Sequence, residues 1–284
     1  MRKLIIGGVP EHFNLPWHLA INEKKFYKNN VALTWKDFPK GTGDMNRALR
    51  EKEIDMAVIL TEGIIRDIVN GNDCKIVQVY VKSPLLWGIH VATNSDYQKI
   101  SDLKGTYAAI SRYGSGSHLM AYVNAENHDW DLKTDLKFEV INDLDGALES
   151  LPDGKGDYFM WEKFMTKPYV DNGVFRLIGE SPTPWPSFVV VVRNDVLEKE
   201  EESISTILDV INSVTVDFKD IEGIDEIIAD EFGQKTSDVS KWLSLTEWDN
   251  KQLTNKELES VQEKLIQLEL IENKLPTQSI LHSF

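Results

Sequence analysis

The sequence predicts an α/β protein with two similar lobes, and three observations lead to that prediction. Short apolar segments alternate with helical ones, which is typical of parallel or mixed sheets covered by helices. Lys52–Met56 and Lys155–Phe159 each place an aspartate just before a strand that follows a strand and a helix. After Arg193 only helical patterns remain, so we expect those helices to pack on the first lobe.

The first lobe is expected to begin with a strand that ends at Gly7 and a helix that contains Pro16 early in its first turn, where proline is tolerated. Thr42 or Asp44 is expected to cap the second helix. Expected strands of this lobe are 3–7, 31–38, 54–60 and 74–81, with helices at about 16–27, from 42 or 44, and 61–69.

The second lobe is expected to follow the same order. Its helix after strand 106–111 opens from the loop Tyr113–Ser117. Two apolar segments, 86–93 and 187–193, are expected to cross between the lobes, which gives residues 1–93 plus 187–284 for the first lobe and 94–186 for the second. The helix that opens from the loop Tyr113–Ser117 is expected to end at about residue 127. Further expected elements are the strands 136–141 and 158–161 and the helices 144–151, 203–216, 225–232 and 254–271.

The amino-acid composition argues against several classes of function. The 284 residues include 31 Lys and Arg against 46 Asp and Glu, a net charge of −15 that disfavours nucleic-acid partners and anionic membrane surfaces. Cys74 is the single cysteine, so neither an intrachain disulfide nor a cysteine-based zinc site can form. No histidine motif of a metal site is present, and no cofactor is expected.

The N-terminal apolar run Leu4–Ile6 stops at a glycine pair, which is shorter than a signal-peptide core needs. No later run is long enough to span a membrane, so no stable membrane insertion is expected. We therefore expect a cytoplasmic protein. The oligomeric state is left open.

Taken in order, several segments resemble the type II periplasmic-binding-protein fold, in which two α/β lobes are joined by two crossover strands. They are Gly7–Pro10, Glu53–Ala57, Ile100–Gly105, Leu270–Pro276 and the two crossovers. Ser101–Gly105 is similar to a segment of solute-binding proteins for sulfonates, nitrate and thiamine precursors. The chain most resembles a small cytosolic branch of this fold found in fungi and bacteria.

That resemblance implies a small-molecule ligand in a cleft between the lobes and closure about a hinge. Fungal thiamine-pyrimidine synthases of this fold carry a cysteine cluster, whereas this chain has only Cys74, so their activity is not implied. The alternative is an enzyme on the same fold, with acid–base chemistry similar to that of menaquinone-pathway or thiamine-pathway enzymes. A binder is favoured over an enzyme.

The loop Gly114–Ser117 is the clearest local signal for a ligand. A glycine-rich turn into a helix exposes unpaired N–H groups, and the helix dipole favours an anion there. Ser115 and Ser117 add hydroxyl groups, while an ordinary capped turn is the structural alternative. We expect a small heterocycle or acid with one anionic group.

The remaining candidates flank strand ends or are aromatic. Glu11 and His12 follow the first strand. Glu62 and Glu162 follow later strands, and their carboxylates are candidates to accept hydrogen bonds from a ligand or to act as a general acid or base. Core packing and helix N-terminal stabilisation are the alternatives. The full set of expected ligand-binding residues is Glu11, His12, Trp17, Thr42, Glu62, Tyr113, Gly114, Ser115, Gly116, Ser117, Trp161, Glu162 and Trp185.

Overall fold

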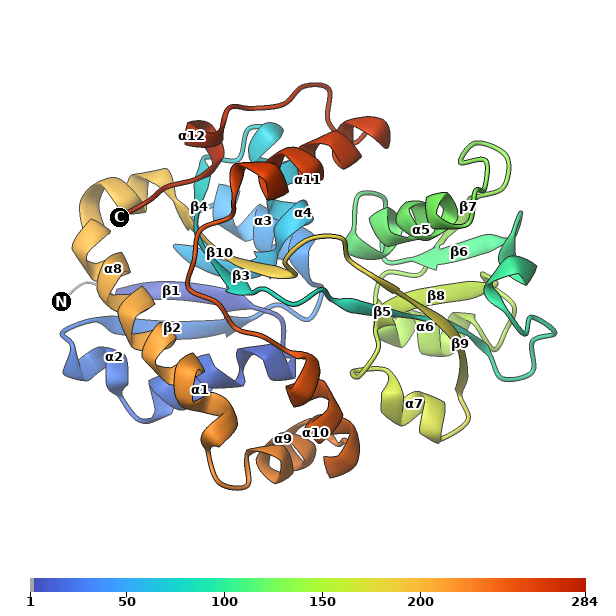
Figure 1. Cartoon of the computed structure of the whole chain (residues 1–284), viewed down its shortest axis with the longest axis horizontal. Coiled ribbons are helices and arrows are strands. Elements are labelled where there is room, and N and C mark those ends of the chain that lie inside the picture. The colour runs from blue at the N-terminus through green and yellow to red at the C-terminus, as the bar shows by residue number, and fades with distance from the viewer. Residues whose placement is uncertain (1–2) are drawn as a thin grey trace. The chain divides into compact units, whose positions relative to one another are not determined.

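The computed structural model describes residues 3–284, and Figure 1 shows the course of the chain. Met1 and Arg2, part of the basic start of the sequence and of the expected first lobe, lie outside the described residues. The chain divides into two compact units. Unit 1 combines the segments 1–83 and 185–284, and unit 2 consists of residues 84–184. No helix in the range 3–284 is both long and apolar enough to cross a bilayer.

Unit 1 is built on a five-stranded sheet in the order β2-β1-β3-β10-β4. β1 pairs in parallel with β2 and β3, while β10 runs antiparallel between β3 and β4. The strands are β1 (Lys3–Gly8), β2 (Ala32–Asp37), β3 (Met56–Leu60), β4 (Cys74–Val81) and β10 (Phe188–Arg193). Phe188 and the four valines that follow it are all buried, as a central strand covered on both faces requires.

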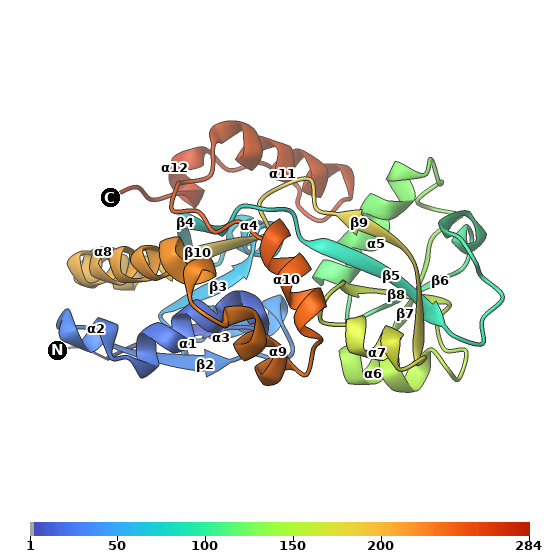
Figure 2. The ribbon, with the colours of Figure 1, turned by 60° about the horizontal axis from the view of Figure 1, so that its bottom comes forward.

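Helices cover both faces of this sheet (Figures 1 and 2). α1, α2 and α8 contact one another on one face, and α3, α4 and α11 lie on the other. The C-terminal helices therefore pack on the first lobe, as the sequence predicted. The helices are α1 (Leu15–Asn22), α2 (Lys25–Lys28), α3 (Thr42–Arg50), α4 (Thr61–Val69), α8 (Asn194–Asp217), α9 (Ile224–Phe232), α10 (Thr236–Leu245), α11 (Asn255–Gln267) and α12 (Thr277–Ile280).

Unit 2 repeats the same plan, with the strand order β7-β6-β8-β5-β9. β6 is parallel to β7 and β8, and β5 runs antiparallel between β8 and β9. α5 packs on one face, and apolar side chains of α6 and α7 pack on the other around Phe159 and Phe175. The elements are β5 (Leu86–Ala92), β6 (Tyr107–Ile110), α5 (Gly116–Asn127), β7 (Lys137–Val140), α6 (Leu144–Ser150), β8 (Tyr158–Glu162), α7 (Lys167–Asp171) and β9 (Phe175–Pro182).

The two aspartates that the sequence singled out have equivalent roles. Asp55 Oδ2 accepts a hydrogen bond from the backbone N–H of Ile5 at 2.9 Å, and Asp157 Oδ2 accepts one from Tyr107 at 2.8 Å. Each carboxylate thus ties the strand it precedes to the first parallel strand of its own sheet. The similarity of the two lobes therefore extends to individual side chains.

The structure differs from the sequence predictions in the bounds of several elements; α8, for example, begins at Asn194 rather than at residue 203. β5 lies wholly in the second sheet and β10 wholly in the first, so unit 2 begins at Pro84 rather than at residue 94. Gly41, with φ of 73°, is the N-cap of α3, and Thr42 is its first residue. The first helix ends at Asn22 because Lys24 adopts a left-handed conformation with φ of 57°. The strand and α-helices that the sequence did not predict are β9, α7, α10 and α12.

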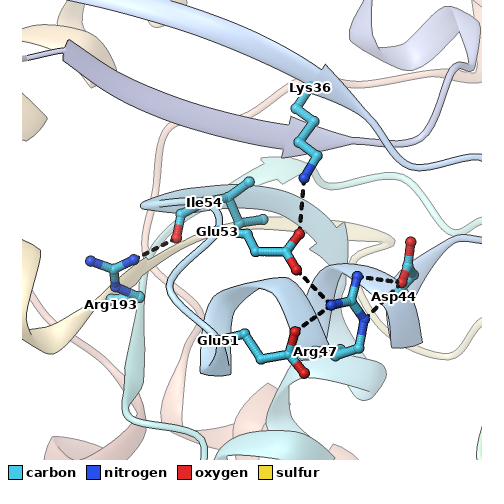
Figure 3. A network of polar contacts seen from close by, with 7 residues as sticks. All are labelled: Lys36, Asp44, Arg47, Glu51, Glu53, Ile54 and Arg193. Carbon is cyan, nitrogen blue, oxygen red and sulfur yellow. Dashed lines mark hydrogen bonds and ion pairs between the residues drawn. The ribbon is translucent and has the colours of Figure 1, made fainter.

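A polar network ties the amino end of β3 to its neighbours in unit 1 (Figure 3). The Arg47 guanidinium on α3 bonds to Asp44, Glu51 and Glu53, and Lys36 of β2 donates to Glu53 at 3.0 Å. These bonds lower the pKa of Glu53 to about 2 and raise the pKa of Arg47 further above its usual range. The network joins the carboxyl end of β2, the helix α3 and the turn before β3.

Candidate functional site

In unit 1 the candidate residues follow the carboxyl ends of three neighbouring parallel strands. β1, β2 and β3 end at Gly8, Asp37 and Leu60, and the segments after them carry Glu11, Thr42 and Glu62. Parallel strands end at one edge of a sheet, which is where open α/β sheets usually bind ligands. The strand pairing therefore brings these three segments to a single edge.

Glu62 is the most constrained side chain at this edge. It lies in the first turn of α4 with 1% of its surface exposed, and its Oε2 accepts a hydrogen bond from Trp185 Nε1 at 2.7 Å. Its Oε1 is buried with no hydrogen-bond partner among residues 3–284. Burial raises the pKa of the carboxyl to about 7, the main effect, and the Trp185 bond opposes it.

The neighbouring Thr61 holds the same incoming segment. Its Oγ1 donates a hydrogen bond to the carbonyl oxygen of Pro186 at 2.6 Å. Two consecutive residues of α4 thus fix the segment that enters β10. Glu62 and Trp185 were both predicted as site residues from the sequence, and the structure brings them into contact.

Thr42 occupies the interface between α3 and α4. A Cβ atom at Gly63 would lie 2.3 Å from Thr42 Cγ2, so the threonine methyl group packs directly on the glycine. Asn46 Nδ2 donates a hydrogen bond to the carbonyl oxygen of Gly63 at 3.2 Å, and this bond holds α3 close to α4. The close approach of α3 to α4 therefore depends on the missing side chain at Gly63.

The first strand–helix junction is more closely packed than its polar sequence suggests. Glu11 is half-buried, and burial raises the pKa of its carboxyl to about 7. The His12 ring has no exposed surface and lies 4.0 Å from the Trp242 ring, centroid to centroid. Burial lowers the pKa of His12 to about 3, so the ring is neutral at pH 7. Trp17 is also fully buried and stacks on Phe26, as the core alternative in the sequence analysis predicted.

In unit 2 the glycine-rich loop lies at the carboxyl end of β6. Gly114 has φ of 77°, a conformation that favours glycine, and Tyr113 beside it is 65% exposed. Ser115 is the N-cap of α5, and its Oγ accepts a hydrogen bond from the backbone N–H of His118 at 3.3 Å. The sequence prediction that this loop opens a helix is confirmed.

The hydroxyl groups of the loop bind one another. Ser117 Oγ accepts from the backbone N–H of Ser111 at 3.0 Å and lies 3.0 Å from Ser115 Oγ. The backbone N–H groups of Gly116 and Ser117 are the first two of α5, and no partner for either is found in the described part of the chain. What the loop offers to an anion is therefore this pair of N–H groups rather than the hydroxyls.

Trp161 and Glu162 end β8 and point to opposite faces of the sheet, because successive side chains of a strand alternate. Trp161 is half-buried and stacks on Phe159 at 5.4 Å, on the face covered by α6 and α7. Glu162 is buried, and its Oε2 accepts a hydrogen bond from the backbone N–H of Met165 at 2.7 Å. Only Glu162 shares a face with α5.

Two further residues in this row, Trp87 and Ser181, are outside the set of ligand-binding residues expected from the sequence, where core packing was the favoured role for Trp87. Trp87 on β5 is directly opposite Glu162 on one side and Ser181 of β9 on the other, so the three side chains share one face. Trp87 Nε1 and Ser181 Oγ are buried and have no hydrogen-bond partner within residues 3–284. The pairing of β5 with β9 reveals this row, and no local motif marks it.

No group of three or more His, Cys, Asp and Glu side chains within residues 3–284 is arranged to hold a metal ion. The strand-end candidates of unit 1 include the Glu62 carboxyl group and the Trp185 indole. Those of unit 2 include the Glu162 carboxyl group and the first N–H groups of α5.

Comparisons with known proteins agree with this architecture. The family model described as Ca3427-like PBP matches residues 87–181. The structure of the CA3427 gene product of Candida albicans, said to define a family with the generic periplasmic-binding-protein fold, aligns with a TM-score of 0.91 and 26% identity over 99% of this chain and 96% of that one. No curated protein sequence matches the chain.

Two ligand-bound structures share the fold at lower identity. The alkanesulfonate-binding protein SsuA from Xanthomonas axonopodis pv. citri, bound to MOPS, aligns with a TM-score of 0.83 and 17% identity over 99% of this chain and 98% of that one. PhnD1 from Prochlorococcus marinus, in complex with methylphosphonate, aligns with a TM-score of 0.64 and 14% identity over 95% and 99%.

The chain therefore has the two-lobed type II periplasmic-binding-protein fold. Within that fold it is similar to the Ca3427-like group, whose name-giving protein is fungal. The resemblance drawn from the sequence is confirmed at this level.

Proposed function

We propose that the protein binds a small solute that carries an anionic group, with contacts from the strand ends of both units. The anion lies on the N–H groups of Gly116 and Ser117, at the start of α5. Glu62 accepts a hydrogen bond from a donor group of the ligand through its unpaired Oε1. Binding brings the two units together about the segments that connect them.

The observation that carries this proposal is the coincidence of unpaired polar groups with the expected edge of each sheet. Buried polar atoms without partners cost free energy, so their presence at a strand-end edge is better explained by a ligand than by folding. Two structures of the same fold hold MOPS and methylphosphonate, and each of these ligands carries an anionic group, a sulfonate or a phosphonate. The same chemistry suits a helix N-terminus.

Catalysis is the second candidate, and one observation favours it. Burial raises the pKa of the Glu62 carboxyl to about 7, the range in which a carboxyl serves as general acid or base near neutral pH. A binder returns its ligand unchanged, whereas an enzyme alters it. Incubation of the identified ligand with the protein, followed by mass spectrometry of the small molecule, separates the two.

The direct test is native mass spectrometry of freshly purified protein, followed by denaturation and identification of the released molecule. We expect one predominant anionic species of low mass. A set of sulfonates, methylphosphonate, pyrimidine precursors and small aromatic acids is then ranked by the shift in melting temperature. If no anion is carried along and no member of the set raises the melting temperature, the proposal is wrong.

We also propose a cytoplasmic location. Cell fractionation with an antibody to the protein tests the proposal, and recovery from a periplasmic or external fraction contradicts it.

A further inference from the structure

His118, which is not among the residues expected from the sequence to bind a ligand, contacts the glycine-rich loop at two points. Its ring is in the first turn of α5, and Nδ1 accepts a hydrogen bond from the backbone N–H of Gly114 at 3.0 Å. Its own backbone N–H donates to Ser115 Oγ. Because an N–H group points at Nδ1, that nitrogen carries no proton, and the neutral ring holds its proton on Nε2.

The orientation of the ring is fixed by aromatic side chains around it. Phe138 of β7 packs edge to face on the imidazole, with 4.5 Å between the ring centroids. Tyr122, one turn further along α5, packs on it in the same way with 5.0 Å between the ring centroids. Tyr113 of the loop makes a third such contact at 5.3 Å. His118 itself is 5% exposed, so the imidazole has little freedom to turn away from Gly114.

The bond to Gly114 falls where the loop needs it most. Gly114 takes the left-handed conformation that turns the chain from β6 towards α5. The hydroxyls of Ser115 and Ser117 then bond to each other and to Ser111, which leaves the N–H groups of Gly116 and Ser117 without partners in the described part of the chain. The conformation that exposes those two groups is thus held by the His118 ring at one end and by the serines at the other.

We infer that His118 is a positioning residue, which holds the loop 114–117 in the form that presents its N–H groups to the ligand's anion. The inference rests on the proposed function for its consequence in binding. The hydrogen bond itself is independent of any ligand.

Two substitutions separate the acceptor from the bulk of the ring. Asn Oδ1 stands at the same number of bonds from Cα as His Nδ1, so His118→Asn keeps an acceptor for Gly114, and His118→Leu removes it. The first readout is hydrogen exchange of the Gly114 amide, measured by NMR without ligand. We expect exchange to become about fivefold faster or more in His118→Leu, which corresponds to one typical hydrogen bond, and to return towards the wild-type rate in His118→Asn.

The second readout is calorimetry with MOPS as the probe. We expect its affinity to fall at least about tenfold in His118→Leu and to be largely restored in His118→Asn, since an anion site loses most when its donors are no longer oriented. His128→Leu is the matched control, because His128 follows the other end of α5 and is exposed. It should change neither readout.

The outcomes distinguish the inference from the proposed function. If wild-type protein does not bind MOPS, the sulfonate as ligand class is wrong, and Gly114 exchange still decides the role of His118. Unchanged Gly114 exchange in His118→Leu, or a His118→Asn variant that behaves like His118→Leu, overturns the inference. In the unmodified protein, nitrogen-15 spectra of the ring at pH 7 should show Nδ1 without a proton, and a proton on Nδ1 contradicts the inference even if both variants fail to fold.

Discussion

Glu62 shows how one buried carboxyl group can serve both binding and a pH response. Its Oε2 is held by Trp185 and its Oε1 has no partner within residues 3–284, while burial raises its pKa from 4.5 to about 7. Between those two values the folded protein binds more protons than the unfolded chain at this site. Its contribution to stability is therefore complete below pH 4.5 and is lost as the pH rises to about 7, by roughly 3 kcal/mol.

Glu62→Gln should remove this dependence, because the amide oxygen still accepts the Trp185 hydrogen bond and the side chain no longer ionises. We expect the variant to be close to wild type at pH 5 and more stable than wild type at pH 8. Melting temperatures at the two pH values measure the difference. Glu53→Gln is the control, since the pKa of Glu53 is already lowered to about 2 and its loss should not help at pH 8. Equal effects of Glu62→Gln at both pH values contradict the account.

Part of the site was predictable at the residue scale and part was not. Gly114–Ser117 and the strand-end carboxyl groups follow from local sequence, because glycine–serine turns and strand–helix junctions are local features. The contact between Glu62 and Trp185 joins residues 123 positions apart, so only the completed sheet creates it. His12 has a polar side chain, yet Trp242 covers it, and no local pattern reports the packing of a distant helix.

At the scale of elements, strongly apolar strands and capped helices were predicted within a few residues, because they depend on local periodicity. The helix 61–69 and the capping box of Thr254 with Glu257 are examples. β9 was missed because Arg176, Gly179 and Glu180 interrupt its apolar pattern, and partners on β5 rather than its own composition make it a strand. The boundary of unit 2 moved for the same reason, since β5 is assigned by pairing.

The Arg47 network predicts a salt-dependent contribution of α3 to stability. Arg47→Met removes the cation that joins Asp44, Glu51 and Glu53 and leaves three carboxylates close together. We expect a lower melting temperature at low ionic strength and a smaller decrease at about 1 M salt, where the screening length is roughly 3 Å. Lys28→Met, which removes the same charge at an exposed position of α2, is the matched control. A decrease that does not depend on salt contradicts an electrostatic role for the network.

At the scale of the whole molecule, the two units share one topology. Within residues 3–284, Glu62 Oε1 in unit 1 and the N–H groups of Gly116 and Ser117 in unit 2 have no hydrogen-bond partner, and each set follows a parallel strand. A ligand that contacts both units favours a closed arrangement only through its higher affinity for that arrangement. It must also stabilise the fold, by about 2.7 kcal/mol at a hundredfold excess over its dissociation constant.

Small-angle scattering with and without the identified ligand tests this closure. We expect a smaller radius of gyration in the saturated protein, together with a higher melting temperature. A raised melting temperature with an unchanged radius of gyration means that the ligand binds without closure, and the second, catalytic candidate then becomes the better explanation.

The central claim, an anion held at the start of α5, is tested most directly by calorimetry of the identified ligand with Gly116→Asp. Aspartate in a helix's first turn is compatible with the helix, so the fold should persist, while the new carboxylate repels the anion and blocks the approach to the N–H groups. Asn127→Asp, which adds the same charge at the far end of α5, is the control. We predict no detectable binding to Gly116→Asp and wild-type affinity for Asn127→Asp; wild-type affinity for Gly116→Asp, with an unchanged circular dichroism spectrum, would contradict the claim.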